Sequence, residues 1–318
     1  MNRWAWRLVL ASACTLLLAA APPTPPISDW SKIETVVVTA QLPGPVLWHV
    51  QQGSSDVWIL ATVAPVPANL SWDNRTVAKL LIGAHLLLLP PRGEVGVFEG
   101  AWFALTSLDT LQQPDGVTLE STLADPLKSR FVAARTANHQ DANRYEKYLP
   151  AVAAVILESD YWKANNMNFN GPQKTVEALA RRASVPVRTV AVYPAMDVIR
   201  DVPNLSPLAQ RACLEDALND IAIESAHVGA AAQAWAIGDL AGIKANYSEI
   251  GLDACLQQSR AYSVLRDREA GDIVNAIADV LKNPGRSVAV VPMGIWLRKG
   301  GVLERLEAAG FTVSGPEG

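Results

Sequence analysis

The chain has 318 residues, of which half are hydrophobic and 18% are charged, and its formal net charge is −4. A chain of this length and composition is expected to fold around a large buried core rather than to stay disordered. No run of basic residues is longer than a pair such as Arg181-Arg182, whereas nucleic acids and anionic membrane surfaces are bound by clustered Lys and Arg. The sequence therefore excludes nucleic acid as a general partner.

Residues 1–21 have the pattern of a secretory signal peptide, which predicts an exported, periplasmic protein. Arg3 and Arg7 give a positive start, the apolar stretch Leu8–Leu18 follows, and Ala19-Ala20-Ala21 supplies small residues for cleavage. Two alternatives stay open, namely a lipoprotein anchored through a cysteine in this segment, Cys14, and an uncleaved N-terminal anchor. No later segment has the roughly eighteen consecutive apolar residues that suggest a transmembrane helix, so we expect no membrane span beyond the signal.

Two cysteines, Cys213 and Cys255, remain once the signal is removed. An even number of cysteines in an exported protein predicts a disulfide bond between them. Such a bond would close a loop of about 42 residues and contribute roughly 4 kcal/mol of stability in the chain-entropy model. The alternative is a pair of buried free thiols.

The segment after the signal, residues 22–43, is Pro-rich and polar, which is typical of a tether, and its β-branched run Ile33–Gln41 predicts a short strand. Two runs rich in Val and Trp then follow, Val46–Gln51 and Asp56–Pro65, separated by Gly53-Ser54-Ser55. Two such runs around a Gly/Ser break predict a β-hairpin.

The remaining pattern predicts strands near both ends of the chain and helices between them. A helix is expected over Val77–Ala84 and a buried strand over His85–Leu89, which Pro90-Pro91 ends. Further helices are predicted over Leu123–Ala137, Glu146–Glu158, Thr175–Ala183, Leu208–Ile223, Ala270–Leu281 and Gly301–Ala309, and further strands over Val185–Val192, Ser287–Val291 and Phe311–Ser314. We therefore expect an α+β fold: a single domain over residues 44–316, with a central mixed sheet built from N- and C-terminal strands and a large, mainly helical middle region.

Three segments in this order resemble motifs of the TraB/GumN family. They are Gly44–Pro67, similar to the family's opening hairpin, Trp235–Leu240, similar to its Trp-x-x-Gly-Asp-Leu motif, and Val290–Val313, similar to its C-terminal strand, loop and helix. The family is related to Tiki-type metalloproteases and to erythromycin-esterase-like and ChaN-like proteins. The resemblance implies a metal site built from two His motifs and a Glu, because a divalent metal that activates water needs imidazole and carboxylate ligands.

This sequence departs from that pattern at each expected ligand. Ala64 stands where the first His is expected, Leu89 or Pro90 where the Glu is expected, and Ile295 where the second His is expected. None of these side chains has a lone pair to give to a metal. We therefore expect no bound metal and no cofactor, and a protein that has lost metal-dependent hydrolysis.

An inherited, metal-free pocket is the binding site that the sequence suggests. The resemblance would bring Trp48 and Trp58 of the hairpin close to Trp296 of the C-terminal motif, with His49 and Thr62 beside them. Aromatic side chains that line a cleft can bind a small molecule or a peptide, although tryptophans more often belong to the core.

The leading hypothesis is thus a non-catalytic binding or regulatory protein, a pseudoenzyme of its family. One alternative is a hydrolase or protease with rearranged or metal-independent chemistry, which would require His49 and two carboxylates with shifted pKa values in one cleft. Another is a cell-envelope protein that pairs the strand Ile33–Gln41 with a partner.

Overall fold

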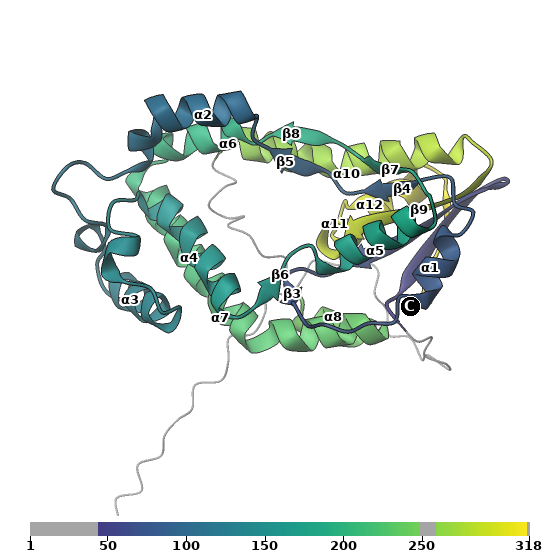
Figure 1. Cartoon of the computed structure of the whole chain (residues 1–318), viewed down its shortest axis with the longest axis horizontal. Coiled ribbons are helices and arrows are strands. Elements are labelled where there is room, and N and C mark those ends of the chain that lie inside the picture. The colour runs from purple at the N-terminus through teal and green to yellow at the C-terminus, as the bar shows by residue number, and fades with distance from the viewer. Residues whose placement is uncertain (1–43, 249–258, 317–318) are drawn as a thin grey trace, which may run out of the picture.

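The computed structural model describes residues 44–248 and 259–316. The predicted signal peptide, the tether with its strand Ile33–Gln41, and Cys255 lie outside the described residues. In Figure 1 the sheet and the helices packed on it form one part of the molecule, and a second, wholly helical part adjoins it.

The predicted hairpin is confirmed as strands β1 (Leu47–Gln52) and β2 (Ser55–Thr62). They pair antiparallel, with His49 opposite Trp58 and Trp48 opposite Ile59. Gly53 has a φ of 58° at the turn, a conformation that glycine adopts without steric cost. Because side chains alternate along a strand, Trp48 and His49 point to opposite faces of the sheet.

A mixed six-stranded sheet joins the two ends of the domain, with the order β10-β1-β2-β9-β4-β7. Strand β9 (Gly285–Pro292) runs parallel to both β2 and β4 (Leu87–Leu89), and β7 (Val187–Thr189) runs parallel to β4 at the edge. The other edge is β10 (Thr312–Ser314), antiparallel to β1. With the helical segments between these strands, the sheet confirms the predicted α+β class.

The predicted unbroken strand Val185–Val192 is wrong, because this segment forms two strands in two sheets. After β7, the chain enters β8 (Val192–Pro194), which pairs with β5 (Arg92–Glu94) outside the six-stranded sheet. The break lies opposite Pro90-Pro91, whose nitrogens carry no hydrogen to donate to a ladder. A third sheet pairs two-residue strands, β3 (Val66–Pro67) and β6 (Met167–Asn168).

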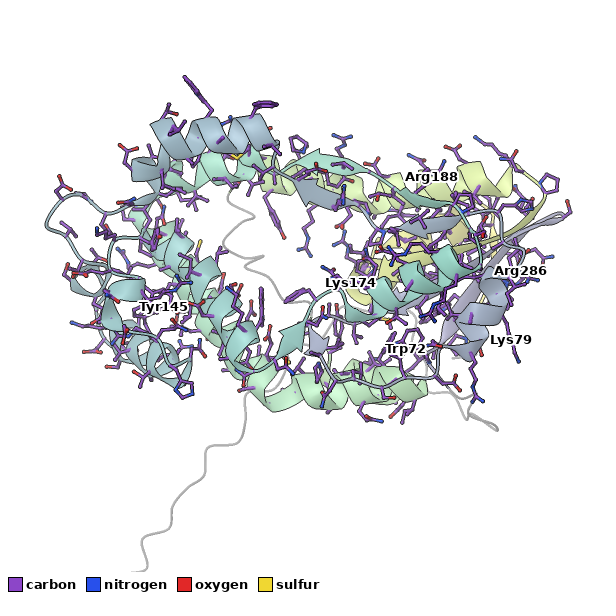
Figure 2. All side chains as sticks on the ribbon, viewed as in Figure 1. Trp72, Lys79, Tyr145, Lys174, Arg188 and Arg286 are labelled. Atoms are coloured by element: carbon purple, nitrogen blue, oxygen red, sulfur yellow. The ribbon has the colours of Figure 1, made fainter. Side chains whose placement is uncertain are left out.

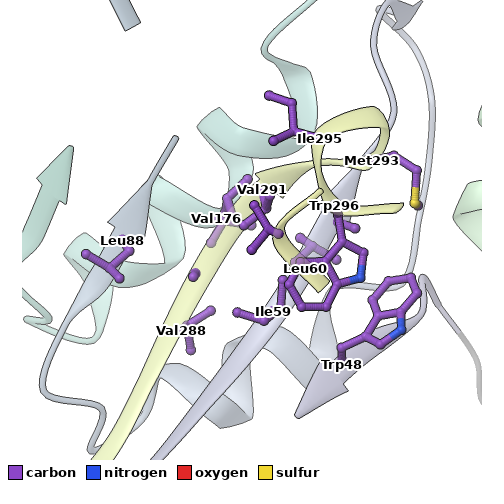
Figure 3. Close-up of a cluster of buried hydrophobic side chains, with 14 of the residues drawn as sticks. Trp48, Ile59, Leu60, Leu88, Val176, Val288, Val291, Met293, Ile295 and Trp296 are labelled. Carbon is purple, nitrogen blue, oxygen red and sulfur yellow. The ribbon is translucent and has the colours of Figure 1, made fainter. Parts of the chain in front are cut away.

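One hydrophobic cluster lies on and around the main sheet. Trp48 and Trp296 lie side by side within it, beside apolar residues of β2 and β9 (Figure 3). Helices contribute much of the rest of the cluster, among them α1 (Arg75–Leu81), α5 (Gly171–Arg182), α10 (Arg260–Leu281) and α12 (Val302–Ala308).

A second hydrophobic cluster holds the helical part together. It is built by α3 (Leu127–Ala137), α4 (Pro150–Ala164) and the first half of α7 (Pro207–Ile237), and it includes Tyr145, which lies far from Arg286 of the sheet (Figure 2). The later residues of α7 belong to the first cluster, so this 31-residue helix connects the two.

The remaining α-helices of the described residues are α2 (Val97–Thr106), α6 (Met196–Asp201), α8 (Leu240–Asn246) and α11 (Met293–Leu297). Among the helices described, none combines the length and the apolar character needed to cross a bilayer.

Candidate functional site

The parallel strands bring the three expected ligand positions to one edge of the sheet, the edge formed by the carboxyl ends of β2, β9 and β4. Thr62 ends β2 opposite Pro292, the last residue of β9, and β4 ends at Leu89. The carboxyl ends of parallel strands form the usual ligand-binding edge of an open sheet. Ala64, Pro90 and Ile295 come directly after these ends.

The side chains at these positions do not fit a metal ion. Ala64 and Pro90 are half-buried and Ile295, in α11, is 6% exposed, and all three present only carbon atoms. Across residues 44–248 and 259–316, no group of three or more His, Cys, Asp and Glu side chains could hold a metal ion. The three described side chains at this edge therefore offer no ligand to a metal ion.

The two tryptophans Trp48 and Trp296 meet in the core rather than at a rim. Their ring centroids are 5.7 Å apart in an edge-to-face arrangement, and the residues are 5% and 0% exposed. The backbone of Gly315 lies so close to the Trp48 ring that a Cβ there would come within 2.3 Å of it. A ligand cannot reach this pair without displacing the core.

His49 and Trp58 lie together on the opposite face of the hairpin. Their rings stack with centroids 4.3 Å apart, and Trp58 Nε1 donates a hydrogen bond of 2.8 Å to Asp56 Oδ2. The same carboxylate oxygen lies 3.4 Å from His49 Nε2 and 3.6 Å from Nε of Arg286. Four of the five predicted pocket residues thus form two pairs on opposite faces. The fifth, Thr62, is half-buried at the end of β2. In the described structure, His49 meets one carboxylate rather than two.

A buried carboxylate that the sequence reasoning missed lies close to the Ala64 position. Glu224 of α7 is 1% exposed, and Trp162 Nε1 of α4 donates to both of its oxygens, at 3.1 and 3.0 Å. Burial raises the pKa of Glu224 to about 7, and the negative charge of Asp220 adds to the shift, while the indole bond opposes it. Glu224 is therefore placed to change its charge near neutral pH.

A second buried carboxylate, Glu158 of α4, faces the same helix. It is 3% exposed, and its Oε1 has no hydrogen-bond partner. Burial raises the pKa of Glu158 to about 8, and repulsion from Asp220, Glu224 and Asp216 raises it further in the same direction. At neutral pH, Glu158 is thus mostly protonated and uncharged.

Glu224 also borders a small cavity directly beside Ala64. The cavity measures about 10 Å³, and its other walls come from the loop after β2, from α7 and from Asn246–Ser248. His227, one turn after Glu224, places Nδ1 3.2 Å from Oδ1 of Asn246 at this wall. A volume of this size holds about one water molecule, so this site admits no larger ligand in the conformation observed.

The sequence carried one signal for this arrangement. Asp216, Asp220 and Glu224 recur every four residues, which places them on one face of a helix, and Glu158 ends the apolar run Val152–Leu157. The acidic face of α7 meets Glu158 because α4 packs against α7. The spacing of acidic residues in the sequence does not show this packing.

The fold and the site define the class of this protein. It is an α+β protein with a mixed sheet, and the expected ligand-binding edge of that sheet lacks the side chains of a metal centre. Residues 46–315 match the family model of the TraB/PrgY/gumN family. The chain therefore belongs to the TraB/PrgY/gumN family, as its motifs indicate. No curated protein and no solved structure matches the chain.

Proposed function

We propose that this chain is an exported, metal-free member of its family that acts by binding a partner rather than by hydrolysis. The observation that carries the proposal is the chemistry at the edge of the sheet, where Ala64, Pro90 and Ile295 replace every expected ligand. A methyl group, a pyrrolidine ring and a branched aliphatic chain cannot coordinate a Lewis acid or activate water.

The small cavity beside Ala64 supports binding at the surface rather than in a deep cleft. A peptide or small molecule needs a larger pocket than one water molecule occupies, and Trp48 and Trp296 are closed off in the core. Of the five residues predicted to form a pocket, His49 and Trp58 remain half-exposed and stacked. We propose this pair as the aromatic contact for such a ligand.

Metal analysis tests the proposal directly. The purified protein should contain no stoichiometric metal, and its melting temperature should not rise when Mn, Co or Zn is added. A metal present at 100 times its dissociation constant would stabilise the fold by about 2.7 kcal/mol, which a melt detects easily. The variants His49→Ala and His85→Ala serve as controls, because His49 is half-buried and His85 is exposed, so either side chain can bind metal adventitiously. Stoichiometric metal that survives both substitutions would refute the metal-free proposal.

Export is tested separately by the mass of the protein purified from its host. A signal peptide cleaved near residue 21 would give a mature chain that begins close to the Pro-rich segment. A lipid-modified Cys14 or an intact N-terminus would instead support one of the anchored alternatives.

Metal-independent acid–base catalysis is the second candidate function, and Glu224 is the observation that favours it. Its pKa of about 7 suits a general acid or base, and it borders the cavity beside the expected ligand position. If the protein hydrolyses a peptide or ester without metal, Glu224→Gln should remove that activity, and Glu215→Gln, at an exposed position of the same helix, should not. If the unmodified protein hydrolyses none of the peptides and esters tested, this second candidate is contradicted.

A further inference from the structure

Helix α2 presents a wide apolar face to solvent. None of its residues is buried, and four large hydrophobic side chains are mostly exposed: Phe98 (92%), Val97 (84%), Leu105 (83%) and Trp102 (69%). At 100° per residue these four, with Ala101 and Ala104, occupy one side of the helix without a polar residue between them. Soluble proteins rarely leave such a patch uncovered.

The other side of α2 attaches the helix to the rest of the protein. Glu99 Oε1 lies 2.8 Å from Arg200 Nη1 of α6, and Phe103 is half-buried. In Figure 1, α2 lies along α6 at the outer edge of the helical part, and in Figure 2 its side chains project outward from that edge. The Glu99–Arg200 ion pair thus marks the side of α2 that faces the protein, and the apolar face lies on the other side of the helix.

We propose that this face binds the same face of a second copy of the chain, with α2 packed against α2 across a two-fold axis. The exposed area is sufficient for this. Aromatic side chains bury on the order of 150–250 Å² each, so these four side chains, two of them aromatic, offer at most roughly 600 Å² on each copy. If all of this surface were covered, the two copies together would bury about 1,200 Å², the lower end of the range for stable protein interfaces.

The shape and sequence of α2 also suit a self-complementary contact. Ala101 and Ala104 lie among the large side chains, so two helices can approach closely while Phe98 and Trp102 of each copy pack beside them. Two residues that flank the helix, Val95 (38%) and Leu108 (46%), are exposed as well.

A lipid surface fits this face less well than a second copy does. Helices that lie in a membrane interface carry Lys and Arg on their polar side, where these contact lipid headgroups. The sequence of α2 contains neither, its only charged residue is Glu99, and the chain as a whole is acidic. These charges disfavour an anionic bilayer and leave a protein face as the better partner.

Sedimentation velocity tests the proposal. The full-length gene is expressed, and the protein is purified with whatever processing the cell has carried out. Over roughly two orders of magnitude in concentration, the protein should pass from monomer to dimer. The double variant Phe98→Ser/Trp102→Ser should weaken the dimer at least about 100-fold, because two central aromatic contacts are lost on each copy. Leu208→Ser is the control, since Leu208 is 72% exposed on a different helix, and it should leave the dissociation constant unchanged.

Cross-linking locates the contact. Ala101→Cys should give a dimer that a mild oxidant links and a reductant releases, whereas Val155→Cys, at a 52% exposed position of α4, should not. A protein that stays monomeric throughout, or a dimer that the double variant leaves intact, would overturn the proposal. So would flotation of the monomer with phosphatidylcholine vesicles that the double variant abolishes, because the face would then bind lipid.

Discussion

The indole N–H of Trp162 donates to both carboxylate oxygens of Glu224, and this contact links α4 to α7 beside the edge of the sheet. Glu224 is 1% exposed, so its charge depends on this bond for compensation. The contact couples the packing of the two helices to the protonation of one side chain. Its consequences can be measured through stability as a function of pH.

Trp162→Phe should destabilise the protein, and by more at high pH than at low pH. The indole bond lowers the pKa of Glu224 while burial raises it to about 7, so removing the indole makes the ionised form still costlier. Below about pH 5 Glu224 is protonated in both proteins, and the difference in unfolding free energy should be small. Above pH 7 the variant should lose about 1–3 kcal/mol, the cost of a buried acceptor without its donor.

Urea unfolding of both proteins at pH 5 and pH 8 measures this difference. Trp72→Phe is the matched control, because Trp72 is also half-buried and packs edge-on against Trp235 rather than against a carboxylate, and it should show no dependence on pH. An equal loss of stability at both pH values in Trp162→Phe would mean that packing, rather than charge, gives Trp162 its role.

Glu158→Gln should stabilise the protein at alkaline pH. The pKa of Glu158 is about 8 in the folded chain, mainly through burial, and its ordinary value is 4.5. Because the folded pKa is raised, the stability that protonated Glu158 provides is complete below about pH 4.5 and is lost as the pH rises through 8. Glutamine keeps the shape and carries no charge, so the variant should gain about 2 to 4 kcal/mol at pH 9 and almost nothing at pH 4.5.

Denaturation curves across this pH range provide the measurement, with Glu215→Gln as control. Glu215 lies on α7, its side chain is 59% exposed, and it pairs loosely with Arg130, so its neutralisation should change stability little at any pH. Parallel curves for wild-type protein and Glu158→Gln would show that Glu158 has the same pKa in the folded and the unfolded chain, which contradicts the raised value.

The strands were readable from the sequence because their signals are local. Alternation and the Gly/Ser break predicted the hairpin of β1 and β2, and the C-terminal apolar run predicted β9. The sequence did not show where a strand changes partner, since the break between β7 and β8 is imposed by Pro90-Pro91 on the opposing strand, roughly a hundred residues earlier.

Helix α7 and the buried carboxylates were harder to predict for related reasons. The predicted helix ended at Ile223, but α7 continues to Ile237 through an Ala-rich run whose small side chains give little apolar periodicity. Nothing in the sequence marked Glu158 and Glu224 as buried, because acidic side chains are usually solvated. Their burial follows from the pairing of α4 with α7, which is a tertiary contact.

Two buried tryptophans offer a test of what a hydrogen bond contributes here. Trp235 and Trp296 are both fully buried, and each meets another tryptophan edge-on, with ring centroids 5.2 and 5.7 Å apart. Trp235 Nε1 donates a 2.7 Å bond to the carbonyl of Ala61, whereas Trp296 Nε1 has no partner. The pair differs mainly in this one interaction.

Trp235→Phe should therefore cost more than Trp296→Phe, by about 1–2 kcal/mol, since it leaves the Ala61 carbonyl buried without a donor. Both variants lose similar volume, so the difference between their unfolding free energies reports the lost Trp235 hydrogen bond together with the removal of the unpaired Trp296 N–H. Equal losses would indicate that the Ala61 carbonyl finds another donor after substitution.

The predicted disulfide gives the last test, because one of its cysteines is already placed. Cys213 is fully buried in the helical cluster, on the same helix as Glu224, and Cys255 lies outside the described residues. If the two are joined, reduction should lower stability by roughly 4 kcal/mol, since the released loop of about 42 residues regains its freedom in the unfolded chain. Mass spectrometry after alkylation should find both thiols blocked until reductant is added. Cys255→Ser should match the stability of the reduced protein, and two reactive thiols in the untreated sample would show that the cysteines are free.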